Sequence, residues 1–217
     1  MAQETVNIIL VDRQRLLKAS LFSDVKSKVE TDLNRLFRNE LKLSFNMLYR
    51  AVDATTNERA SFRKFDFVIY IFNQKDPPRT DVREINQIMQ DHQIRDKGEA
   101  GKFYRIAQEE WRRDAGEGIG IPPLTGYRKV GFIKMDFIFR RTTCEPKDFL
   151  TNVVKHEFGH MCNAAIISHT KQLMALSVPC LWVDYLPEDR ARIFATLRYL
   201  QSFNEQQLDK QYIKSNP

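Results

Sequence analysis

Two histidines and a glutamate lie within five residues of one another, at His156, Glu157 and His160, and form the pattern H-E-x-x-H. Residues four apart lie on one face of an α-helix, so the two imidazoles would converge on a single point in front of that face. Imidazole is a common zinc ligand, and a glutamate beside two such ligands can take a proton from a water molecule at that point. The spacing therefore predicts a Zn2+ site with Glu157 as the general base of a hydrolysis.

The residues around this pattern favour a helix. Pro146 and Asp148 are typical of a helix start, and apolar residues then recur at helical spacing, at Phe149, Leu150, Val153, Val154, Phe158 and Met161. The alternative is a buried helix whose histidines are only hydrogen-bonded to neighbours. We favour the metal site, because burying two histidines and a glutamate on an apolar helix costs free energy that a structural role does not require.

A catalytic zinc ion needs three protein ligands and one open position. The chain has four histidines, and His92 lies in a charged stretch that is typical of an exposed surface. His169 follows His160 by nine residues, where this helix is expected to end. We therefore expect His169 to be the third ligand, with the carboxylates of Asp184 and Glu188 as alternatives.

The elements that must position this helix follow from the periodicity of the apolar residues. The sequence predicts strands over 5–11, 43–52, 65–72 and 129–139, a helix capped by Ser23 between the first two strands, and a final helix over about 188–211. Residues 116–126 are rich in Gly and Pro and predict an irregular edge strand, which could pair with an extended peptide. The charged stretch from 76 to about 115 is interpreted as a surface excursion. The predicted fold class is α/β (α+β), with a twisted mixed sheet and an active-site helix.

Length and composition are those of an ordinary globular protein. The 217 residues are 42% hydrophobic, which favours a single catalytic domain (1–217) with an N-terminal lobe to residue 162 and a smaller C-terminal lobe over 163–217. The net charge of +6 is scattered, so nucleic acid is a possible but not a favoured partner. No signal peptide or membrane span is visible, and the odd count of three cysteines favours a cytoplasmic or otherwise intracellular setting, with a Cys162–Cys180 bridge left open.

The order of these elements, ending in the H-E-x-x-H helix, resembles the catalytic domain of the metzincin zinc peptidases. Phe158-Gly159 is similar to the H-E-x-G-H variant of the matrixin branch, and Met174 within 172–176 resembles the Met-turn beneath the metal. Residues 186–193 are similar to the acidic start of the matrixin C-terminal helix. The resemblance implies a zincin fold, a bound Zn2+ and an oxyanion-stabilising tyrosine, for which Tyr185 is the candidate.

The sequence departs from the metzincin pattern H-E-x-x-H-x-x-G-x-x-H at two positions. Asn163 stands where the family has glycine, and Ile166 stands where it has the third histidine. Asparagine tolerates the left-handed backbone conformation better than most residues, so a sharp turn at Asn163 is still expected. A three-residue insertion would then carry His169 to the metal.

These observations predict a zinc-dependent endopeptidase that binds a protein or peptide substrate as an extended strand. Two alternatives belong to other classes. One is a SprT-like, DNA-associated metalloprotease, which the basic charge permits but the strand-rich front half disfavours. The other is a catalytically inactive zincin-fold binding module, which the intact Glu157 disfavours.

Overall fold

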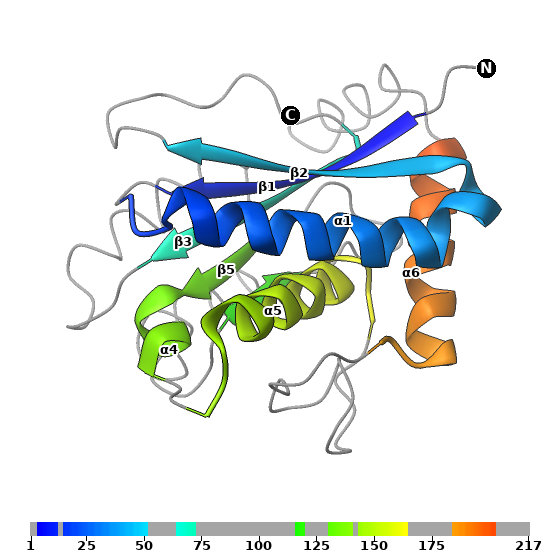
Figure 1. Cartoon of the computed structure of the whole chain (residues 1–217). Helices are drawn as coiled ribbons and strands as arrows, with labels where there is room; N and C mark the ends of the chain where they lie inside the picture. The colour runs from blue at the N-terminus through cyan, green and yellow to red at the C-terminus, as the bar shows by residue number, and fades with distance from the viewer. Residues whose placement is uncertain are drawn as a thin grey trace, which may run out of the picture.

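The computed structural model describes residues 4–12, 15–51, 64–72, 116–119, 130–140, 143–164 and 184–202. The described helices and strands (Figure 1) are, in chain order, β1 (Glu4–Asp12), α1 (Ala19–Leu41), β2 (Leu43–Ala51), β3 (Asp66–Phe72), β4 (Gly116–Ile119), β5 (Val130–Lys134), α4 (Met135–Arg140), α5 (Pro146–Met161) and α6 (Pro187–Ser202). The strand–helix–strand–strand order at the start of the chain is therefore as predicted.

The strands form one mixed sheet in the order β2-β1-β3-β5-β4. The neighbours β2, β1, β3 and β5 pair in parallel, whereas β4 pairs antiparallel with β5. In β1 the five residues from Ile8 to Asp12 are all buried, as expected for an inner strand of a parallel sheet, and its β-branched run is typical of such a strand. Among the described strands, the order places β2 at one edge of the sheet and β4 at the other. The edge strand predicted over 116–126 is thus observed over Gly116–Ile119, and residues 120–126 lie outside the described residues.

Helices α1 and α5 lie next to each other over one face of the sheet (Figure 1). The two helices share a single core with the strands beneath them. Phe158, inside the H-E-x-x-H pattern, is fully buried, and its ring packs edge-on against Phe67 of β3 and Phe45 of β2, with centroid separations of 4.9 Å and 6.1 Å. The motif itself therefore anchors α5 to the middle of the sheet.

Two elements differ from their predicted bounds. Helix α1 begins at Ala19 rather than after Ser23, and its N-cap, Lys18, makes no side-chain hydrogen bond; partly buried apolar residues in the added turn pack on the core and stabilise it. The strand predicted over 129–139 ends at Lys134. The following residues form α4, in which Met135 and Ile138, three apart, are buried. A short apolar run fits a strand or a helix equally well, so the prediction of a longer strand was wrong.

The predicted final helix is described in part. Helix α6 accounts for the predicted final helix as far as Ser202. The charged stretch from 76 to about 115, and the end of the final helix beyond residue 202, lie outside the described residues.

The outer edge of β2 is covered by side chains of α1. Asn34 accepts a hydrogen bond from the Phe45 amide (3.1 Å) through Oδ1 and donates to the Phe45 carbonyl (3.3 Å) through Nδ2. One turn and two turns earlier in α1, Glu30 accepts from the Met47 amide (2.7 Å) and Lys26 donates to the Met47 carbonyl (2.8 Å). Side chains spaced four apart on a helix thus replace a neighbouring strand, which protects this edge from pairing with another chain.

Replacing both acceptors in the Glu30→Ala/Asn34→Ala variant is expected to expose this edge. The free energy of unfolding should fall by about 1–3 kcal/mol, because the backbone groups of Phe45 and Met47 lose partners, and the variant should self-associate. Urea denaturation and light scattering after size-exclusion chromatography measure the two effects. Asn39→Ala, at an exposed position of the same helix, is the control; a double variant as stable and as monodisperse as this control would contradict the role of the edge cover.

Candidate metal centre

The helix that carries the pattern begins as predicted. Pro146 occupies the start of α5 and Asp148 lies in its first turn, where a negative charge is favoured by the helix dipole. The predicted apolar stripe is buried in full, and every residue from Phe149 to Gly159 is buried. The helix is therefore held on all sides at the point where the histidines begin, which keeps their backbone positions fixed relative to the sheet.

The two motif histidines meet at their ring nitrogens. Nε2 of His156 lies 2.9 Å from Nε2 of His160, and the two rings are nearly perpendicular, at 85°. Ligands of one tetrahedral zinc ion, at about 2.0–2.1 Å from the metal, are about 3.3 Å apart. The two nitrogens are thus at hydrogen-bond distance, about 0.4 Å closer together than two ligands of one tetrahedral zinc ion. By residue type and by their place on one face of the helix, the two histidines fit a zinc ion.

Glu157 lies inside the protein beside the histidines. Its exposed fraction is 1%, against 8% for His156, whereas His160 is only half-buried. Electrostatic interactions are strengthened at such a buried position because little water screens them. The role of Glu157 as the general base stays a prediction of the sequence.

The third ligand is not established by the described residues. Within 4–12, 15–51, 64–72, 116–119, 130–140, 143–164 and 184–202, no group of three or more His, Cys, Asp or Glu residues is placed to hold a metal ion. The predicted ligand His169 lies outside these residues, as does the Met-turn residue Met174. Of the two carboxylate alternatives, Asp184 forms an ion pair with Arg35, whose Nη2 donates to both carboxylate oxygens, at 2.8 Å and 2.9 Å. Glu188 is exposed in the first turn of α6.

The chain turns sharply directly after the helix. Asn163 has a positive φ of 62°, and the helix end has the hydrogen bonds of a Schellman motif: Asn163 donates to the His160 carbonyl (3.0 Å) and Ala164 to the Gly159 carbonyl (2.9 Å). This is the conformation that glycine adopts most easily and that asparagine tolerates. The turn predicted at Asn163 is therefore confirmed.

Tyr185 contacts the back of the helix. The residue is buried, and its hydroxyl donates a hydrogen bond to the Lys155 carbonyl, one residue before His156. Burial raises the pKa of Tyr185 well above its usual value, and nearby negative charge adds to the shift, so the hydroxyl keeps its proton and remains a donor. In this structure Tyr185 holds the α5 backbone, in place of the oxyanion role implied by the resemblance.

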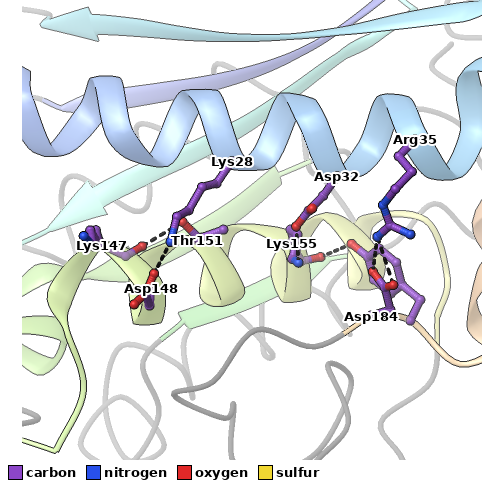
Figure 2. Close-up of polar contacts among 9 residues, drawn as sticks. Lys28, Asp32, Arg35, Lys147, Asp148, Thr151, Lys155 and Asp184 are labelled. Carbon is purple, nitrogen blue, oxygen red and sulfur yellow. Dashed lines mark hydrogen bonds and ion pairs between the residues drawn. The ribbon is translucent and has the colours of Figure 1, made fainter.

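A buried ion pair behind the site was not predicted from the sequence. Lys155, with a side chain only 1% exposed, lies 2.6 Å through Nζ from Oδ2 of Asp32 on α1. Lysine and aspartate in amphipathic helices are usually exposed, so the pattern gave no reason to expect this pair. The two residues lie in the middle of the α1–α5 contact, where Figure 2 shows them between two further ion pairs.

The cysteines bear on the predicted setting of the protein. Cys144 is disulfide-bonded, whereas Cys162 keeps a buried thiol, so the Cys162–Cys180 bridge that the sequence left open is not formed. Disulfides persist mainly in oxidising compartments, so the disulfide at Cys144 does not favour an intracellular compartment. The intracellular location stays a prediction. Among the described residues, no helix has the length and apolar character needed to cross a membrane.

Comparison with known proteins identifies the fold. No protein-family model matches the sequence, and no curated protein matches it either. A crystal structure of an archaemetzincin from Methanopyrus kandleri is similar to this chain, with a TM-score of 0.52 and 9% sequence identity over 89% of this chain and 96% of that chain. At this identity the likeness concerns the fold alone. The mixed α/β fold predicted from the sequence is confirmed, and it is similar to the fold of this archaemetzincin.

Replacing Tyr185 by Phe is expected to lower the free energy of unfolding by about 1 kcal/mol at pH 7, through loss of the hydrogen bond to Lys155. A tyrosine in an unfolded chain ionises near pH 10, whereas folded Tyr185 stays neutral to a higher pH. Its contribution to stability is therefore complete below about pH 10 and is lost as the pH rises further, by up to about 1.4 kcal/mol per pH unit. Urea denaturation between pH 7 and 11 should show a smaller alkaline loss for Tyr185→Phe than for the wild type.

The exposed Tyr199 of α6 provides the matched control for this prediction. Tyr199→Phe should keep the full alkaline loss of the wild type. Identical pH profiles for the two phenylalanine variants would show that Tyr185 does not carry the effect.

Proposed function

We propose that this chain is a zinc-dependent endopeptidase. The observation that carries the proposal is the convergence of Nε2 of His156 and His160, 2.9 Å apart, beside the buried Glu157 on one helix. The likeness of the fold to an archaemetzincin, whose name places it among the metzincins, supports the same conclusion. His156, His160 and His169 would hold the metal, and the left-handed turn at Asn163 supports His169 because it redirects the chain directly after His160.

Glu157 is the general base of the proposed reaction. It accepts the proton of the attacking water and then donates that proton to the departing amine, which removes the need to expel a charged nitrogen. When bound, zinc supplies Lewis acidity, which makes the water more acidic and polarises the scissile carbonyl.

The substrate is proposed to bind as an extended strand along β4. This strand lies at the edge of the sheet and is in contact with α5, the helix that carries the histidines. The opposite edge, at β2, is covered by the side chains of Lys26, Glu30 and Asn34. A peptide backbone that pairs with β4 would lie beside the proposed metal site, and pairing through backbone groups would accept many sequences.

A zincin-fold binding module without catalysis is the second candidate. It is favoured by one observation: the ring nitrogens of His156 and His160 lie at hydrogen-bond distance, 2.9 Å, an arrangement that two histidines can adopt without a metal. The two candidates differ in whether a complete metal site forms and whether Glu157 matters.

Elemental analysis and a cleavage assay on an unfolded protein substrate test the proposal. The wild type should hold one zinc per chain and cleave the substrate. His169→Ala should lose most of the zinc, and Glu157→Gln should keep the zinc while the rate falls by about 10²–10⁴-fold, because only the base is removed. His92→Ala, at the fourth histidine, is the control and should retain both properties.

The outcomes separate the candidates. A wild type that holds no zinc after reconstitution would exclude the metallopeptidase and leave the binding module. Zinc retained in full by His169→Ala would instead assign the third ligand to another residue, Glu188 or Asp184.

A further inference from the structure

The charges that face α1 alternate in sign: Asp148 and Lys155 lie on α5, and Asp184 lies in the segment before α6. On α1, Lys28, Asp32 and Arg35 follow one another at intervals of four and three, so they form one stripe along the helix. The residues opposite them have the complementary signs in the same order. Figure 2 shows the three resulting ion pairs side by side: Lys28–Asp148, Asp32–Lys155 and Arg35–Asp184.

The central pair differs from the outer two in its burial. The side chains of Lys155 and Asp32 are 1% and 9% exposed, whereas those of Lys28 and Arg35 are 43% and 48% exposed. Exposed pairs contribute little to stability. A buried charge that loses its partner, by contrast, is strongly destabilising, because neither water nor protein then compensates it.

The alternation specifies the register of the two helices. One helical turn is about 5.4 Å, which is close to the spacing between neighbouring charges on α1. A displacement of α5 by one turn in either direction would carry the Lys155 ammonium from Asp32 to a like charge, at Lys28 or at Arg35. The apolar residues of the two helices do not discriminate in this way, because one aliphatic contact can replace another at similar energy.

The register of α5 is also the position of the proposed ligands. His156 follows Lys155 directly, and His160 lies one turn further along the same rigid helix. The carbonyl of Lys155 accepts the Tyr185 hydroxyl, and the neighbouring Asp184 is held by Arg35, so the segment before α6 is tied to the same point. A metal site tolerates errors of only about 0.2 Å in its ligand distances, which is far less than one helical turn.

We infer that Asp32 and Lys155 are positioning residues, which fix α5 in register with α1 and thereby place His156 and His160 for metal binding. The inference rests on the proposed function as a zinc site. Apolar replacements of a buried ion pair are often as stable as the pair itself. The Asp32–Lys155 pair therefore acts on the position of α5 more than on the free energy of unfolding.

The Asp32→Leu/Lys155→Met variant tests this role. Zinc affinity is measured by competition with a chelator, and the register is measured without metal from the NMR signals of ¹⁵N-labelled imidazoles. The variant is expected to unfold at a urea concentration similar to that of the wild type, to bind zinc about 10–100-fold more weakly, and to give shifted or multiple signals for His156 and His160. The control is Glu4→Leu/Lys64→Met, which removes an ion pair between the start of β1 and the residues before β3 and should leave both measurements unchanged.

A second variant keeps the buried pair intact. Arg35→Glu changes the sign of an exposed side chain, so the protein should fold, and it offers Lys155 a carboxylate one turn from Asp32. Zinc affinity should fall and additional histidine signals should appear. Arg35→Lys preserves the sign and should behave as the wild type.

Folded variants with wild-type zinc affinity and unchanged histidine signals would overturn the inference. If the wild type itself binds no zinc, the proposed function fails separately, and the imidazole signals of the metal-free proteins decide the register role alone. Signals that change in Asp32→Leu/Lys155→Met and Arg35→Glu, but not in Arg35→Lys, support the role; unchanged signals overturn it.

Discussion

The burial of α5 is the constraint on which the rest of this structure depends. One side of the helix is apolar and packs on the sheet, where Phe158 contacts Phe67 and Phe45. A second side faces α1 through the Asp32–Lys155 pair. The histidines project from a third side. His156 lies about 100° round the helix axis from Lys155, because consecutive residues of an α-helix are separated by that angle. A single helix therefore has to satisfy three environments at once, which leaves it little freedom to move without breaking one of them.

The two edges of the described sheet differ in what contacts them. At β2 the backbone groups of Phe45 and Met47 are hydrogen-bonded by side chains of α1, namely Asn34, Glu30 and Lys26. Helix α1 therefore both covers the core and occupies the backbone groups of that edge. At the other end of the strand order, β4 lies against α5. The proposed extended substrate would pair with β4, the edge strand that contacts the helix carrying the histidines.

Much of this architecture could be predicted from the sequence because it depends on local patterns. The helix start at Pro146, the apolar stripe of α5 and the turn at Asn163 each follow from the preference of a few residues, and all are confirmed. The helix α4 was missed because a short apolar run has no distinctive period. The Asp32–Lys155 pair was missed for a different reason: its partners are 123 residues apart, and burial of a charge depends on the packing of both helices rather than on either sequence.

The evidence for the fold and the evidence for the site come from different features of the chain. At 9% identity, the likeness to an archaemetzincin reflects strand order and helix placement, which many unrelated side chains can support. The convergence of His156 and His160 is independent of that likeness, because it follows from their spacing on a helix whose bounds the structure fixes. The likeness therefore concerns the fold, and the proposed zinc site rests on the histidines themselves. The residues that connect the two are those that hold α5 in register, since the histidines keep their positions relative to the sheet only if this helix cannot slide.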